Sequence, residues 1–113
     1  MVIKGNGTFA EQLPIFHTGI LTATTRSDSH HDIYIMDRDD YFNKSEIDFN
    51  KAIQSKTGIL NSYIEHSCNG NPLVVIVKNK SSEPIELSLI LEHVEQKQIF
   101  TSAFGGRNPF VNI

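Results

Sequence analysis

A strictly alternating stretch that begins at Ile85 constrains the fold of this chain more than any other. Its apolar side chains recur at every second position: Ile85, Leu87, Leu89 and Leu91. A period of two residues places them on one face of a pleated strand. The run from Leu73 to Val77 is aliphatic throughout, which favours a strand covered on both faces. Because only a polar link ending in Pro84 separates the two stretches, the sequence predicts a β-hairpin whose strands pair directly.

Turn signals divide the rest of the chain into short segments with strand composition. Strands are expected at 8–15, 20–25, 32–37, 47–53, 59–66 and 99–104, with turns at 26–30, 54–58 and 67–72. Acidic residues that follow Met36 can cap one short helical turn near residues 38–46. Short strands spaced about 8 to 12 residues apart predict an all-β fold: a single antiparallel, jelly-roll-like β-sandwich of about eight strands over residues 1–113.

Three stretches together resemble the GOLD-type (Golgi dynamics) β-sandwich. They are Ile20–Thr25, the segment from Asp32 through the aromatic turn Asp40-Tyr41-Phe42, and Leu73–Leu89 with its aliphatic strand, polar link and alternating strand. The resemblance covers roughly residues 15 to 94 and implies a jelly-roll-like module that binds proteins or lipids, with no catalytic residues. The chain lacks the paired cysteines and the membrane helix of the cargo-receptor members, so the resemblance does not imply a trafficking role.

Composition narrows the classes of partner. The chain has 113 residues, a formal charge of −3 and no basic stripe, which argues against nucleic acid. Its longest apolar run is far below the roughly 20 residues of a spanning helix, and its N-terminal segment lacks the long apolar region of a secretory signal. The single cysteine, Cys68, excludes an internal disulfide framework. We therefore expect a cytoplasmic protein or a component of a virus particle.

The function that the sequence favours is a non-enzymatic interaction module, an oligomer-forming or structural subunit of a larger protein assembly. Val74, Ile76 and Ile90 form a second apolar face on the predicted hairpin. An apolar row that faces away from the core usually needs a partner. The C-terminal segment adds four more apolar side chains to this expected interaction surface: Phe104, Phe110, Val111 and Ile113.

One alternative is a carbohydrate- or lipid-binding module that uses the loops 37–46 and 67–72. Its rim would carry acidic, aromatic and amide side chains: Asp37, Asp39, Asp40, Tyr41, Phe42 and Asn69.

A further alternative is a small metal-dependent hydrolase built on His31, His66 and His93, because imidazole groups suit zinc. Their spacing matches no compact zinc motif. We therefore expect surface or turn histidines, no cofactor and no enzyme.

Overall fold

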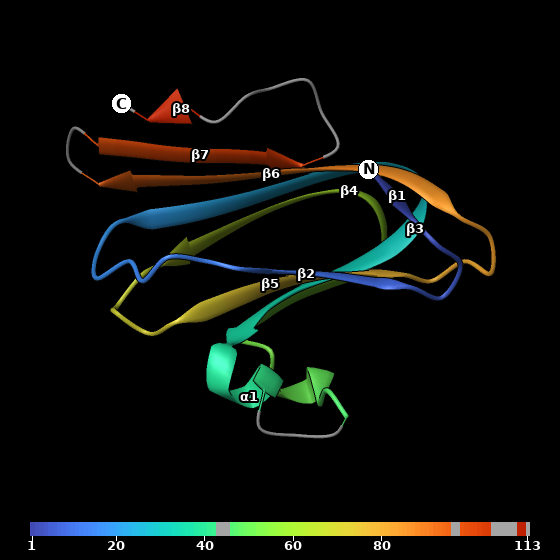
Figure 1. The fold of residues 1–113 in the computed structure, drawn as a ribbon, viewed down its shortest axis with the longest axis horizontal. Coiled ribbons are helices and arrows are strands. Elements are labelled where there is room, and N and C mark those ends of the chain that lie inside the picture. Colours follow the sequence, from blue (N-terminus) through green and yellow to red (C-terminus); the bar gives the residue numbers. More distant parts are fainter. Residues whose placement is uncertain (43–45, 96–97, 105–110, 113) are drawn as a thin grey trace.

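An antiparallel β-sheet accounts for most of the computed structural model, which describes residues 1–42, 46–95, 98–104 and 111–112 (Figure 1). Within these residues the strands are β1 (Val2–Ile3), β2 (Thr8–Gln12), β3 (Ile20–Asp37), β4 (Gln54–Ser67), β5 (Leu73–Asn79), β6 (Ile85–Glu95), β7 (Gln98–Phe104) and β8 (Val111–Asn112). Helical structure is limited to α1 (Arg38–Phe42) and the 3-10 turn η1 (Phe49–Lys51). The predicted all-β class is confirmed. Neither helical segment of the described chain is long and apolar enough to cross a membrane.

The long strand β3 organises the sheet because three strands pair with it. β4 follows one edge of β3, from Ile20 opposite Ser67 to Ile35 opposite Gln54. On the other edge, β6 pairs with residues 20–27 and β5 with residues 31–37. β5 and β6 therefore lie end to end along β3. β2 flanks β5, while β1 and β7 flank β6, and the sheet curls about the middle of β3 (Figure 1).

This arrangement corrects the predicted hairpin. Both strands exist, but β5 and β6 each pair with β3 and not with one another. The polar link between them is anchored by Asn79, which is fully buried. Its side-chain amide donates to the carbonyl oxygens of Ile3 at 3.1 Å, Lys4 at 3.0 Å and Glu83 at 2.8 Å. These bonds tie the β5–β6 link to the β1–β2 turn, and the chain then continues along β3 instead of folding back.

Three further expectations fail locally. Residues 26–30 and 54–58 belong to strands β3 and β4, and the β3–β4 register shifts between Arg26 and His31 and again before Ile33. Such irregularities act as β-bulges, which bend a strand without ending it. Residues 47–53, expected as a strand, contain η1, whose N-cap Asp48 accepts a bond from the Asn50 amide at 3.1 Å. The helical turn expected near residues 38–46 is α1.

The inner, concave side of the sheet carries the main hydrophobic core. Leu21 and Ala23 enter it from the first half of β3, and Ile33 and Ile35 enter it from the second half. The alternating row of β6 that begins at Ile85 is buried there as predicted. One face of the sheet is therefore shared by strands from both halves.

The outer side of the second half is also covered. Four fully or nearly buried side chains form a separate cluster there: Tyr34, Met36, Val74 and Ile76. The segment that follows β3 packs over them through Tyr41, Ile47, Phe49 and Ala52. The interpretation of Val74 and Ile76 as an interaction surface is therefore wrong, because both are fully buried within the chain itself.

Candidate functional site

The three candidate metal histidines lie apart. Nε2 of His31 is 2.7 Å from Oγ1 of Thr25, whereas Nε2 of His93 donates to the carbonyl oxygen of Thr18 at 2.7 Å. His66 is half-buried on β4, opposite Leu21 of β3. In the part of the chain that the structure describes, no group of three or more His, Cys, Asp or Glu side chains is arranged to hold a metal ion.

His31 belongs instead to a buried chain of hydroxyl groups. Its Nδ1 lies 3.3 Å from the carbonyl oxygen of Ser29, which can only accept, so Nδ1 carries the proton and Nε2 accepts from the Thr25 hydroxyl. Thr25 Oγ1 in turn is 2.6 Å from the Ser62 hydroxyl, which donates to it. Burial lowers the pKa of His31, so the neutral ring that this chain requires is the favoured form. All three side chains of this network are buried.

The loops 37–46 and 67–72 do lie together, as a shared rim requires. The Arg38 amide donates to the carbonyl oxygen of Pro72 at 2.9 Å, and Asp37 pairs with Leu73. Asn69 is exposed at this end of the sheet, and its side-chain oxygen accepts from the Asn71 amide at 3.3 Å.

The other expected rim residues point in different directions. Phe42 is 54% exposed, whereas Tyr41 packs on the covered cluster beneath α1. Asp39 is exposed, and Asp40 lies 3.9 Å from the Lys51 ammonium. Oδ1 of Asp37 is buried and has no hydrogen-bond partner among the described residues. Residues 43–45 of the loop lie outside the described part of the chain, and the remaining side chains do not converge on one site.

Of the expected apolar interaction surface, Ile90 is the residue that the structure places on an outer face. It is half-buried on β6, opposite Thr24 of β3. Phe104 and Val111 lie in β7 and β8, but the structure does not describe their side chains. Phe110 and Ile113 lie outside the described residues.

Ile90 belongs to a surface that we call the open face, the outer side of the first half of the sheet. Three rows of side chains cross it from β4 through β3 to β6: Ser67, Ile20 and Val94; Glu65, Thr22 and Glu92; Tyr63, Thr24 and Ile90. Ile20 and Val94 are each 40% exposed and Tyr63 is 52% exposed. No described segment covers this half of the sheet as residues 38–42 and 46–53 cover the other.

The open face is acidic as well as apolar. Glu65 and Glu92 flank Thr22, and the three rows contain neither lysine nor arginine. The Tyr63 hydroxyl donates to Oε1 of Glu65 at 2.8 Å, and this bond raises the pKa of Tyr63. The ring is therefore held on the surface as a neutral phenol beside a carboxylate.

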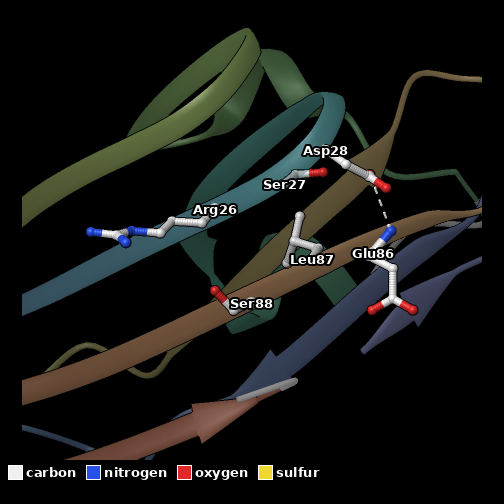
Figure 2. Close-up of a pocket in the computed structure, with 6 residues that line it drawn as sticks. All are labelled: Arg26, Ser27, Asp28, Glu86, Leu87 and Ser88. Carbon is white, nitrogen blue, oxygen red and sulfur yellow. Dashed lines mark hydrogen bonds between the residues drawn. The ribbon is translucent and has the colours of Figure 1, made fainter.

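A groove with several charged side chains adjoins the open face where β3 bends away from β6. Its volume is about 390 Å³, and its lining residues come from the two strands: Arg26, Ser27, Asp28, Glu86, Leu87 and Ser88. Figure 2 shows Arg26 at one end and Asp28 and Glu86 at the other, with Leu87 between them. The Glu86 amide donates to Oδ1 of Asp28 at 3.3 Å, so Asp28 bridges the two strands where their backbone pairing ends.

Sequence reasoning missed both the open face, apart from Ile90, and the groove. A signal for the open face was present, because Ile20, Thr22 and Thr24 alternate with buried Leu21, Ala23 and Thr25. No comparable signal marked the groove, whose residues meet only because β6 pairs with β3.

Comparisons with known proteins bear on the fold. No protein-family model matches the sequence, and no curated protein is detectably similar to it. Among solved structures, the chain is similar to the crystal structure of the mitogen YPM derived from Yersinia pseudotuberculosis, with a TM-score of 0.54 and 16% sequence identity. The match covers 86% of this chain and 82% of the mitogen. At this identity the similarity concerns the fold alone.

Proposed function

We propose that this chain is a non-catalytic subunit of a larger protein assembly and that it makes contact through the open face. One observation carries the proposal: the outer side of the sheet is covered by residues 38–42 and 46–53 over one half, whereas Ile20, Tyr63 and Val94 are exposed over the other. Apolar side chains gathered on one uncovered face are typical of a protein contact.

The charge of the open face indicates the chemistry of the partner. Glu65 and Glu92 lie between the row of Ile20 and the row of Tyr63. Two copies stacked row upon row would bring these carboxylates together, which is unfavourable. The partner that fits is a different protein with aliphatic side chains and nearby lysine or arginine.

The same proposal takes the curled sheet to be a jelly-roll-like β-sandwich. Two observations support this. Both halves of β3 contribute to one core, and the structural match to the mitogen covers most of the chain. A role like that of the mitogen does not follow from the fold, and the GOLD-type resemblance stays a prediction.

The test is site-specific photo-crosslinking in the source cell, with benzoylphenylalanine in place of Tyr63. We expect a covalent adduct that Ile20→Ser and Val94→Ser each diminish. Ile15→Ser is the matched control, because Ile15 is exposed to a similar degree, 47%, but lies in the loop before β3. Charge reversal by Glu92→Lys should also weaken the adduct, and added salt should weaken it in the original chain.

Sedimentation velocity of the purified chain supplies the second measurement. A monomer is expected across the accessible concentration range. If the chain instead forms a dimer that Ile20→Ser dissociates, the partner at the open face is a second copy of the chain and not a basic protein. If Ile20→Ser and Val94→Ser change the yield of the adduct no more than the control Ile15→Ser does, the open face is not the contact surface.

A further inference from the structure

We propose that the groove between β3 and β6 is a binding site for an uncharged saccharide. The site adjoins the open face, because Arg26 and Ser88 lie two residues beyond Thr24 and Ile90 on β3 and β6, but it shares no residue with the three rows of that face. The inference therefore does not rest on the proposed protein contact.

The lining of the groove selects a hydroxylated ligand. Small-molecule pockets are usually lined by apolar and aromatic groups, with few polar ones. Here five of the six lining residues carry a polar or charged group, although the surface that lines the groove is slightly more apolar than polar, as in other ligand sites. A saccharide hydroxyl both donates and accepts, so it can use the carboxylates of Asp28 and Glu86, the Arg26 guanidinium and the serine hydroxyls.

These polar groups have unused bonding capacity. Oδ1 of Asp28 accepts from the Glu86 amide, and its second oxygen has no hydrogen-bond partner among the described residues. Ser27 Oγ accepts from the Ser29 amide at 3.1 Å, which leaves its hydroxyl hydrogen free to donate. Within the same part of the chain, no ion pair joins Arg26 to a carboxylate. Groups on both strands can therefore turn to a ligand without breaking an internal ion pair.

Charge decides against other ligand classes. The groove holds two carboxylates and one guanidinium, so an anion such as phosphate would gain Arg26 but face repulsion from Asp28 and Glu86. A polycation would meet the opposite problem at Arg26. An uncharged ligand that needs donors and acceptors at both ends avoids both penalties.

The backbone beneath the groove is fixed in advance. Two hydrogen bonds join Leu87 to Met1. The Leu87 amide donates to the Met1 carbonyl oxygen at 2.9 Å, and the Met1 terminal ammonium donates to the Leu87 carbonyl oxygen at 2.8 Å. A rigid floor lowers the entropic cost of binding. Ligand selection is then left to the exposed side chains of Arg26, Asp28 and Glu86.

The experiment is a ¹⁵N–¹H NMR titration of the whole chain with maltose, lactose, cellobiose and N,N′-diacetylchitobiose, each to about 20 mM, which detects millimolar dissociation constants. We expect at least one sugar to shift the amide signals of residues 26–28 and 86–88. Glu86→Ala and Arg26→Ala should each lower the affinity for that sugar about tenfold, because each removes a hydrogen bond to a charged group. Glu83→Ala, which removes an exposed carboxylate outside the groove, should leave the affinity unchanged.

Three results would overturn the inference. The first is no shift in the groove with any of the four sugars. The second is a shift that Glu86→Ala and Glu83→Ala reduce equally. The third is a stronger response of the groove to inorganic phosphate or spermidine than to every sugar. Ile20→Ser should leave sugar binding intact, so failure at the groove remains separable from failure at the open face.

Discussion

The substitution Thr25→Val tests the buried hydroxyl chain directly. Thr25 is fully buried and stands between two partners, Nε2 of His31 at 2.7 Å and the Ser62 hydroxyl at 2.6 Å. Valine keeps the branched shape and the strand propensity but removes the oxygen that both partners share. His31 Nε2 and the Ser62 hydroxyl then remain buried, and each has lost its hydrogen bond to Thr25.

The expected cost follows from counting the stranded groups. A buried donor or acceptor that loses its partner costs about 1–3 kcal/mol, so two such groups predict a loss of about 2–6 kcal/mol. Small domains have total free energies of unfolding of about 5–15 kcal/mol, so the variant should fold but be clearly weakened. Thr24→Val is the matched control, because Thr24 is the next residue and faces outward, half-exposed. Its effect should stay within about 0.5 kcal/mol.

Urea unfolding followed by far-ultraviolet circular dichroism measures both variants. The midpoint should fall for Thr25→Val with little change in the slope, since the exposed surface of the unfolded chain is the same. Ser62→Ala in the Thr25→Val background should cost less than in the original chain, because its hydroxyl has already lost this bond. A loss below about 0.5 kcal/mol for Thr25→Val, or strict additivity of the two changes, would refute the network as described.

Three further predictions concern pH, a glycine and a buried amide. Because burial lowers the pKa of His31 from its ordinary value of 6.5, the unfolded chain takes up that proton first, and the free energy of unfolding should fall as pH drops below about 6.5 until the folded form protonates as well. His31→Met should reduce this pH dependence in urea titrations, whereas His30→Asn, at an exposed position, should keep it. Gly19→Ala should lower the calorimetric Tm more than Gly58→Ala does. Both glycines have positive φ, but only at Gly19 would the added carbon meet another group, His93 Nε2 at 2.6 Å. A Tm for Gly19→Ala no lower than that of Gly58→Ala would contradict this contact. Asn79→Ala removes bonds to three carbonyl groups and should lower the free energy of unfolding by about 2–4 kcal/mol in urea, and a loss below about 1 kcal/mol would show that the β5–β6 link is held by other contacts.

The sequence determined the strands better than their pairing. The alternation of β6 predicted its buried face because periodicity is a local property of the chain. The pairing of β5 and β6 was predicted wrongly because both strands satisfy their backbone groups with β3, a segment distant in sequence. Composition showed only that the link between β5 and β6 is polar, since an amide that bonds three carbonyl groups within the fold has the same sequence signature as one in a solvated turn.

The two halves of the sheet differ in whether their outer face is covered. Ile90 and Val74 were both expected on a second apolar face of the hairpin, turned away from the core. Val74 is covered because residues 38–42 and 46–53, part of which was expected as a strand, pack across that half of the sheet. Ile90 lies on the half where no described segment does so. Which outer face stays open depends on the path of one connection, and periodicity carries no information about that path.

The irregular middle of β3 links the buried network to the groove. The strand pairs with β6 up to Ser27 and with β5 from His31 onward, so the residues between them must pass from one half of the sheet to the other. On the inner side, this passage buries His31 and requires the hydroxyl of Thr25 to satisfy it. On the side toward β6, it leaves the Glu86 amide without a strand partner and brings Asp28 in to accept from it. Straightening the bulge would therefore remove the polar core and the groove together. For this reason, variants that disturb Thr25 should also perturb the NMR signals of residues 26–28, even though Thr25 does not line the groove.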